Sequence, residues 1–424
     1  MMEKSSLVAF SNCSIIDLGS VLRISLVLVI FAETDDTLEE LAGSLKNILS
    51  EKTLPSWLET VDSGNGGYTL GETIDGKNPE GTKTLVSQPR LLWALSWAHV
   101  HGFSEPGKDY LAAAKSGYDF IVKNFWDEED KGYIFSTDIS GAPVDEGKYL
   151  QGHTNLIFAF VEYYKASKDG GALQAALDIP GLISENAVDN VNAIGGFFED
   201  FNKDWSLVTE PQGSGSLGTR GFKTDNGIIG LVLSLAELVK VSVDPEVKEL
   251  LESVVDSASL LFYPKNPAVA VSKRTLTGEQ KGEFPLTAYG HLVEFAWMKV
   301  EAEIALGRTP DWDFFDEYVR HSFEQGRDDQ TGGLLEVGEL AWWPQLEVMR
   351  MAATEKKHRG GGIHDDLVKD VVKFYVCELL DSDDGLAVWS VNSDGSIRND
   401  VKSSMWKAGY HEVRGMGELN AAYS

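Results

Sequence analysis

From about residue 37 onward, two kinds of segment alternate along this 424-residue chain. Long stretches with an apolar position every three or four residues are typical of helices, and the short glycine-led segments between them are typical of β-hairpins. The stretches 91–98 and 156–164 are apolar nearly all round, which predicts buried helices. By contrast, 109–123 is amphipathic and 186–193 is polar, so we expect both in helices on the outside of the molecule.

The glycine-led segments recur at a regular interval. They begin, in order, at Gly66, Gly132, Gly195, Gly332 and Gly385. Several contain an Asp-Gly or Ser-Gly turn, whose residues tolerate a positive φ. The units that they mark are about 55 to 70 residues long, except for one interval of about twice that length. We infer that one copy has diverged around residues 262–275, which gives about six units of one hairpin and two helices.

Repeated pairs of one inner and one outer helix bury a continuous core only when neighbouring units stack. Six such pairs predict an all-α fold, the (α/α)6 barrel or toroid, with short β-hairpins at one end whose loops line a central funnel. An open helical solenoid is the alternative, but it gives no reason for the recurrent hairpins. A βαβ sheet is disfavoured because no β-branched runs alternate with the helices.

The first 32 residues depart from this pattern. An apolar run at 21–32 is too short to span a bilayer and matches the hydrophobic region of a signal peptide. Few basic residues precede this apolar run, so two other interpretations stay open. The run could be a strand of the core, or the start codon could be assigned too far upstream. We therefore divide the chain into a leader at 1–32, dispensable to the fold, and a single catalytic barrel domain at 37–424. If the leader is a cleaved signal peptide, we expect the protein to be secreted; if it is not, we expect a cytoplasmic location.

The net charge of the chain disfavours some classes of binding partner. It carries 66 acidic and 37 basic residues, a formal net charge of −29, and a field of that sign repels phosphate backbones and anionic lipids. We therefore expect no nucleic acid and no membrane span, and a monomer or homodimer. Two cysteines exclude a disulfide framework and a cysteine-rich metal site. No metal, phosphate-loop or dinucleotide motif stands in a fitting context, so we expect no metal and no other cofactor.

Two histidines stand near the starts of predicted inner helices. His291 precedes Glu294 by three positions, so the two share a helix face, where a carboxylate can fix the imidazole tautomer and raise its basicity. His411 and Arg414 repeat this spacing. A glutamate among apolar neighbours is costly to bury without a partner, which indicates that Glu294 has one.

Further polar and aromatic groups begin other inner helices. Arg90 opens the buried helix at 91–98, and Trp343 precedes Glu347 by four positions. His153 begins another inner helix, from which it would reach the funnel, with a structural role as the alternative. Titratable groups that converge with tryptophans in one concavity predict a carbohydrate site. The remaining histidines are interpreted as helix-terminal or solvated: His99, His101, His321, His358 and His364.

Four short motifs give the chain a resemblance to a known family. They are Gln-x-Arg at 88–90, Gly-His-x-x-Glu-x-x-Trp at 290–297, Trp-Trp-x-Gln-x-Glu at 342–347 and Trp-Lys-x-x-Tyr-His-x-x-Arg at 406–414. In this order and at these separations they resemble the N-acylglucosamine 2-epimerase family, which includes cellobiose 2-epimerases and mannose and sulfoquinovose isomerases. The resemblance covers about residues 37–420. It implies the (α/α)6 barrel that the repeats predict independently.

The resemblance implies a sugar isomerase or 2-epimerase that acts on a mono- or oligosaccharide through an enediol intermediate, without a cofactor. His411 would remove the C2 proton, His291 held by Glu294 would be the second acid/base, and Arg90 would stabilise the enediolate oxygen. The substrate-binding residues that it implies are Trp343, Glu347, Trp406, Arg414, Asp225 and His153.

One position departs from the family pattern. Family members carry Asn-Met-His near the start of the inner helix after the third hairpin, whereas this chain has Gly227 in the place of the histidine. Asp225 or His153 would then supply its contact, and we expect Gly227→His to fit sterically. A polysaccharide lyase or glycoside hydrolase on the same barrel, and an inactive sugar-binding homologue, are the alternatives that this departure leaves open.

Overall fold

A computed structural model describes residues 36–424 except 71–80, 194, 210–220 and 278–286. The predicted leader at 1–32 lies outside the described residues, and so does the part of the first hairpin after Leu70. None of the helices that the structure describes is long and apolar enough to cross a membrane.

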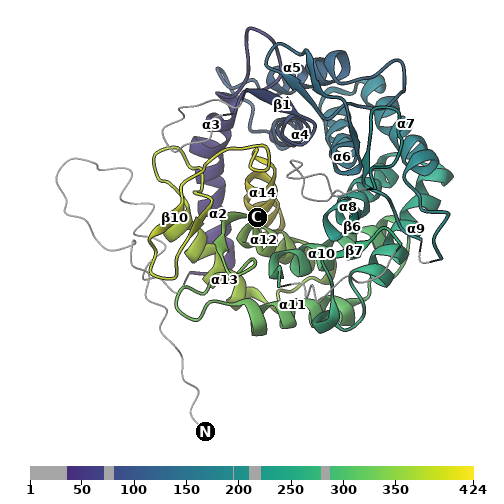
Figure 1. Ribbon diagram of the computed structural model, residues 1–424. Helices are drawn as coiled ribbons and strands as arrows, with labels where there is room; N and C mark the ends of the chain where they lie inside the picture. Colours follow the sequence, from purple (N-terminus) through teal and green to yellow (C-terminus); the bar gives the residue numbers. More distant parts are fainter. Residues whose placement is uncertain (1–35, 71–80, 194, 210–220, 278–286) are drawn as a thin grey trace.

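The described chain forms two concentric rings of helices (Figure 1). The inner helices are α4 (Ser87–Val100), α6 (Leu150–Ser167), α8 (Asp225–Val241), α10 (Tyr289–Ala305), α12 (Trp342–Arg359) and α14 (Tyr410–Tyr423). The outer positions are taken by α2 (Leu38–Ile48) with η1 (Leu49–Thr53) and α3 (Leu54–Leu58), α5 (Tyr110–Asn124), α7 (Gly170–Asn186), α9 (Pro245–Leu261), α11 (Trp312–Gly326), and α13 (Asp365–Phe374) with η3 (Tyr375–Leu379). Each inner helix packs against the next, and α14 packs against both α4 and α2. The ring is therefore closed, which confirms the (α/α)6 barrel and excludes the open solenoid.

The hydrophobic pattern explains which helices lie inside. In α4 nearly every residue from Ser87 to Ala98 is buried, whereas in α11 only one side is, through residues such as Phe315 and Val319. The outer and inner helices also differ in whether the N-cap side chain makes a capping hydrogen bond. Asp or Thr side chains cap five of the described outer helices, but five of the six described inner helices have no capping hydrogen bond from the N-cap side chain.

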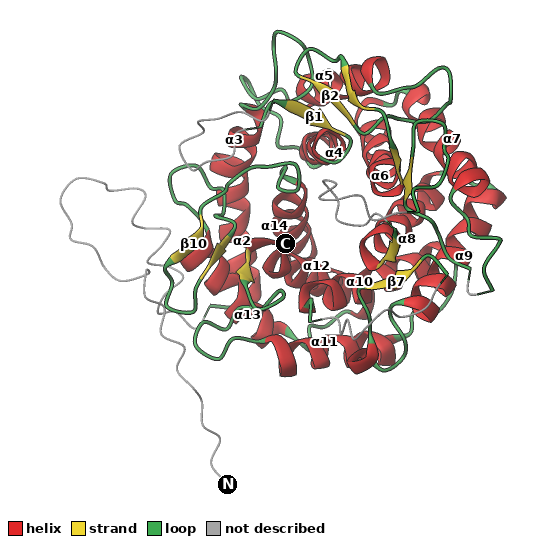
Figure 2. Cartoon of the chain, in the orientation of Figure 1, coloured by secondary structure: helices red, strands yellow, loops and turns green. Residues whose placement is uncertain are grey.

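Short strands occupy the end of the barrel where the inner helices begin (Figure 2). They are β1 (Thr82–Thr84), β2 (Ser136–Asp138), β3 (Pro143–Asp145), β4 (Lys148–Tyr149), β5 (Asp200–Phe201), β6 (Phe222–Thr224), β7 (Lys273–Thr275), β8 (Leu340–Ala341), β9 (Ser390–Val391) and β10 (Ile397–Asn399). The antiparallel pairs β1–β2, β4–β5, β6–β7 and β8–β9 each join one repeat to the next. Since β4, β6 and β8 run directly into α6, α8 and α12, these pairs fix where three inner helices start.

The diverged repeat predicted at 262–275 is present. Val271 N–H donates to Phe262 O at 3.1 Å, in the place where other repeats have bridges such as Val61–Tyr68, and the 3-10 turn η2 (Pro267–Val269) lies between them. The interpretation of 186–193 as part of an outer helix is wrong, because that helix ends at Asn186 and Val188 already pairs with Phe197 in the hairpin.

An Asp–Lys pair whose lysine is buried holds four of the hairpin loops. The aspartate follows an outer helix and the lysine precedes the next inner helix; the pairs are Asp62–Lys83, Asp127–Lys148, Asp189–Lys223 and Asp381–Lys402. Each aspartate also accepts hydrogen bonds from backbone N–H groups of its own turn. These pairs anchor the loops over the barrel mouth.

Candidate functional site

A cavity of about 320 Å³ opens inside the barrel at the hairpin end. All six inner helices or the loops before them contribute to its wall. The lining residues are Arg90, Gln151, Thr154, Asn155, Phe158, Asn226, Ile229, Gly230, Leu233, His291, Glu294, Met298, Glu336, Trp342, Trp343, Trp389, Trp406, Tyr410 and His411. The funnel expected from the sequence therefore exists, and it combines aromatic, neutral polar and titratable side chains.

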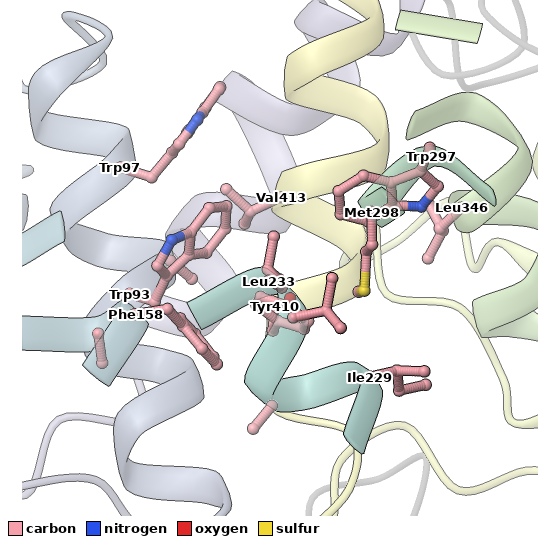
Figure 3. Close-up of a cluster of buried hydrophobic side chains, with 14 of the residues drawn as sticks. Trp93, Trp97, Phe158, Ile229, Leu233, Trp297, Met298, Leu346, Tyr410 and Val413 are labelled. Carbon is pink, nitrogen blue, oxygen red and sulfur yellow. The ribbon is translucent and has the colours of Figure 1, made fainter. Parts of the chain in front are cut away.

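An apolar layer forms the floor of this cavity (Figure 3). Phe158, Leu233, Met298 and Tyr410 belong to one cluster of buried side chains. Phe158, Leu233 and Tyr410 also line a second cavity of about 340 Å³, which extends toward the other end of the helices. This layer therefore separates the mouth of the barrel from its far end.

His411 is held through one ring nitrogen by a buried carboxylate. Its Nδ1 lies 2.6 Å from Glu347 Oε1, while the other Glu347 oxygen accepts from Trp297 Nε1 at 3.0 Å. Burial would raise the pKa of Glu347, but the Arg414 charge and the His411 hydrogen bond outweigh it and lower the pKa to about 2. An ionised carboxylate only accepts hydrogen bonds, so Nδ1 of His411 carries the proton and Nε2 is available to act as a base.

Arg414 connects this pair to Glu294. Its guanidinium donates to Glu347, to the Tyr410 hydroxyl, and to Glu294 Oε1 at 3.1 Å. Burial and then the charge of Glu347 raise the pKa of Glu294 to about 8. One cation thus serves two carboxyl groups, and it holds the pKa of Glu347 below that of Glu294.

The rings of His291 and His411 both lie close to Trp343. The Trp343 ring centroid lies 4.8 Å from the His291 ring and 5.7 Å from the His411 ring. Burial, and then the proximity of His411, lower the pKa of His291 to about 4, so this imidazole is neutral near pH 7. Both imidazoles thus lie beside one indole inside one cavity.

The carboxyl groups nearest His291 differ from the sequence prediction. Glu294 shares the helix with His291 as expected, but its carboxyl group is drawn to Arg414. Instead, the His291 Nδ1 lies 3.6 Å from Asp225 Oδ2 and 3.6 Å from Glu336 Oε1. The expectation that Glu294 holds His291 is therefore wrong, because a buried guanidinium from α14 binds that carboxyl group more closely.

Arg90 lies at the cavity wall beside two aromatic rings. Its guanidinium donates to the Trp406 carbonyl oxygen and lies 5.5 Å from the Tyr410 ring and 5.9 Å from the Trp406 ring. Burial lowers the pKa of Arg90 to about 10, so the side chain stays charged near pH 7. It is the one Lys or Arg side chain among the described lining residues.

The predicted site residues fall into three groups. His291, His411, Glu294, Arg90, Trp343 and Trp406 line the cavity. Glu347, Arg414 and Asp225 are buried behind the lining. His153 lies outside the cavity, since its Nε2 accepts from Tyr133 N–H at 3.1 Å and its Nδ1 faces the Tyr149 carbonyl oxygen at 2.9 Å. Both of its ring nitrogens thus have backbone partners.

Two expectations about other positions are wrong. A Cβ at Gly227 would lie 2.6 Å from the Glu199 carboxyl carbon, so histidine does not fit there. Gly230 is the glycine of α8 that faces the cavity.

His358 and His364 are not solvated, because they lie 3.2 Å from the buried carboxylates of Glu301 and Glu355.

Sequence reasoning missed several lining residues. Gln151, Thr154 and Asn155 on α6 bring neutral polar groups, and the amide nitrogen of Asn155 is buried without a hydrogen-bond partner. Glu336 lies in a hairpin loop that carries no recognisable motif. In the sequence, Gly338 indicates a tight turn there, but nothing indicates that Glu336 faces the cavity. The motif residues Gln88 and Gln345, by contrast, bind hairpin backbone at Tyr68 and Leu334.

Two clusters of described residues have side chains close enough to share a metal ion: Glu294, Glu347 and His411, and separately Asp316, Glu355 and His364. In the first, Arg414 binds both glutamates, and in the second, Arg359 binds Asp316 and Glu355. A guanidinium already occupies the acceptor oxygens of each cluster. These donor sets therefore fit an internal cation better than a metal.

The chain is similar in sequence and fold to several known proteins. The sequence profile of N-acylglucosamine 2-epimerase (GlcNAc 2-epimerase) matches residues 67–215. A cellobiose 2-epimerase of Ruminococcus albus is 26% identical over 395 residues, covering 88% of this chain and 96% of the relative. The structure of cellobiose 2-epimerase from Spirochaeta thermophila superposes with a TM-score of 0.80 at 26% identity, covering 91% of this chain and 97% of that one. A D-mannose isomerase shares the fold, with a TM-score of 0.74 at 17% identity over 88% of this chain and 96% of that one.

The fold and the cavity define an (α/α)6 barrel with a carbohydrate-type site at its hairpin end. Within that class, the chain is similar to the N-acylglucosamine 2-epimerase family, which is the resemblance that its four motifs indicated.

Proposed function

We propose that this protein is a sugar 2-epimerase or aldose–ketose isomerase that moves a proton at C2 of a reducing sugar. The observation that carries the proposal is the placement of two imidazoles in one cavity. His411 and His291 lie close to Trp343, and both line the space that a sugar would fill. The cellobiose 2-epimerases among the relatives and the D-mannose isomerase fold support the same class of reaction.

His411 is the better candidate for the base that acts first. Its Nε2 removes the C2 proton of the open-chain sugar, and the C2–H bonding electrons move toward C1 as the carbonyl oxygen gains charge, which gives an enediolate. The imidazolium that forms is stabilised by ionised Glu347 through Nδ1. His291, neutral before the reaction, provides the second acid/base. Return of the proton to the opposite face of C2 epimerises, and return to C1 isomerises.

The developing negative charge is met by Arg90 and by the helix ends. Arg90 is charged and faces the cavity, so it can donate to an enediolate oxygen. The inner helices all begin at this end, and their partial positive charges converge on the same space. Their N-cap side chains mostly leave these ends without a capping hydrogen bond.

The lining favours a neutral sugar over a phosphorylated one. Trp342, Trp343, Trp389 and Trp406 offer aromatic faces, on which the apolar faces of sugar rings pack. Among the described lining residues only Arg90 is a permanent cation, and it is already bonded to a carbonyl oxygen, whereas two glutamates also face the space. A phosphate would meet one cation and two carboxyl groups there.

A glycoside hydrolase has weaker support. Hydrolysis requires two carboxyl groups on opposite sides of the scissile bond, about 5 to 9.5 Å apart. One oxygen of Glu294 and one of Glu347 lie within 4.8 Å of each other, and both groups bind the same guanidinium. These two carboxyl groups share the Arg414 guanidinium, and they do not face each other across a substrate.

The proposal is tested by incubating the protein with neutral reducing sugars, both mono- and disaccharides, and separating the products. We expect a C2 epimer or the corresponding ketose, and we expect His411→Asn and His291→Asn each to lower its formation by at least about 100-fold. His321→Asn is the matched control, since that histidine lies on the outer helix α11. Release of a new reducing end, or an unsaturated product, would overturn the proposal in favour of a hydrolase or a lyase.

A further inference from the structure

His291 has a buried ring nitrogen without a hydrogen-bond partner. The imidazole side chain is 16% exposed, and its Nδ1 is inaccessible to solvent. A neutral histidine carries one proton, and the group that the other nitrogen meets decides which nitrogen carries it. The environment of Nδ1 therefore controls whether Nε2 is a proton acceptor.

Two carboxyl groups from different repeats converge on this nitrogen. Asp225 is the first residue of α8, directly after β6, and Glu336 lies in the loop before β8. One oxygen of each lies 3.6 Å from the His291 Nδ1. This distance is longer than a hydrogen bond, but catalytic hydrogen bonds are often long before substrate binds and tighten afterwards.

Both carboxyl groups are held by partners of their own. Glu336 Oε2 accepts from Gly290 N–H at 3.1 Å, which turns Oε1 toward the imidazole. Asp225 Oδ1 accepts from Asn226 N–H at 2.9 Å, and Oδ2 accepts from the Tyr263 hydroxyl at 3.3 Å. The two acidic side chains are therefore oriented before any substrate arrives.

The loop that carries Glu336 is built at a cost in backbone strain. Glu336 and Glu339 exchange two backbone hydrogen bonds, of 2.8 and 2.9 Å, around Val337 and Gly338, which have φ of 49° and 79°. Such a turn favours asparagine and glycine, and a β-branched residue with positive φ is uncommon. The Ala288–Glu336 bridge then fixes Glu336 against the start of α10.

We propose that Asp225 and Glu336 are the positioning residues of His291. The Nδ1–H of His291 donates to this carboxyl pair in the substrate complex, which leaves Nε2 to take up and return the substrate proton. The kinetic part of this inference rests on the proposed function.

The buried surroundings of the pair favour the protonated form of both acids. Burial raises the pKa of Asp225 to about 7 and that of Glu336 well above its ordinary value, and the charge of Asp225 adds to the second effect. The other titratable groups that face the pair are Glu294, Glu199, His291 and Tyr263. A proton on the His291 Nδ1 would lie beside these acids, 3.6 Å from one oxygen of each.

The test uses Asp225→Asn, Glu336→Gln and the double variant, which keep the size of each side chain. Glu339→Gln is the matched control, because Glu339 closes the same turn but pairs with Arg398. Proton transfer to the sugar and the ring ¹⁵N shifts of labelled histidine are measured, with the His291 signals assigned through His291→Asn. We expect the double variant to lose about 10- to 100-fold in kcat with little change in KM, and to shift the His291 ring signals.

Unchanged kcat and unchanged His291 ¹⁵N shifts in the double variant would overturn the inference. A loss of kcat with unchanged ¹⁵N shifts would also overturn it, because the pair would then act elsewhere. The nitrogen shifts require no turnover. If the wild-type protein converts no sugar, the proposed function fails while the ¹⁵N shifts still decide the role of the pair.

Discussion

The two candidate bases are supported in different ways. His411 makes a 2.6 Å contact with an ionised carboxylate, whereas the Nδ1 of His291 lies between two carboxyl groups that are 3.6 Å away. The charge of Glu347 stabilises an imidazolium at His411, and burial destabilises one at His291. Of the two imidazoles, His411 is therefore the one whose Nδ1 is within hydrogen-bond distance of a carboxylate in the described part of the chain.

Removing the charge of Glu347 tests this arrangement. Glu347→Gln leaves Arg414 buried beside a neutral amide and takes the ionised partner from His411. We expect proton transfer to fall by about 10- to 100-fold and the free energy of unfolding to fall by about 3–5 kcal/mol. Enzyme kinetics and denaturant unfolding measure the two effects. Glu418→Gln, which keeps an oxygen for Trp97 Nε1, is the control, and wild-type kcat in Glu347→Gln would contradict the assignment.

Individual residues also show where sequence reasoning stopped. The spacing of Glu294 from His291 correctly placed both on one helix, but helix spacing cannot report that Arg414 arrives from another repeat. For the same reason Glu336 was missed, because its contact with His291 depends on how two hairpin loops pack. Gly227 was misjudged because the Glu199 side chain that fills its space comes from the preceding loop.

At the scale of elements, local pattern predicted more. Helix periodicity separated buried α4 from amphipathic α5, and glycine spacing located even the diverged repeat near residue 271. These features depend on residues that are close in sequence, so they can be predicted from the sequence alone. The Asp–Lys pairs were not predicted, because nothing in a lone aspartate signals that its partner is a lysine 21 positions later.

Breaking one of these pairs is expected to destabilise the barrel mouth. Asp127→Asn leaves Lys148, which is 0% exposed, without its carboxylate, so we expect a loss of about 3–5 kcal/mol in the free energy of unfolding. Asp119→Asn, in the exposed pair with Lys115, should leave that energy nearly unchanged. Denaturant unfolding of the three proteins measures the difference, and equal losses in both variants would contradict this account.

The same pair predicts a dependence on pH. Burial opposes ionisation of Asp127, but its hydrogen bonds from Lys148 and from backbone N–H groups outweigh burial and lower its pKa. A pKa that is lower in the folded state adds stability above the unfolded value of about 3.9, and that stability disappears as the pH falls through the folded pKa. The deficit of Asp127→Asn relative to wild type should therefore be full at pH 6 and shrink below about pH 4. A deficit that grows on acidification would be inconsistent with this sign.

Across the whole molecule, the two ends of the barrel differ electrostatically. All six described inner helices begin at the hairpin end, where the cavity collects their positive ends. At the other end, a chain of ion pairs joins four of these helices: Glu162, Lys165, Glu237, Lys240, Glu301 and Arg350. Lysines there meet the negative helix ends. The positive ends of the inner helices thus converge where an enediolate would form, within a chain of net charge −29.

The central claim is that two histidines move a carbon-bound proton of a reducing sugar. The most direct measurement is NMR of the sugar after incubation with the protein in D₂O. We predict deuterium at C2 of the epimer, or at C1 or C2 when a ketose forms, and no incorporation with His411→Asn acting on the same sugar. A product that carries no deuterium at C1 or C2, such as a hydrolysed or unsaturated saccharide, would contradict the account.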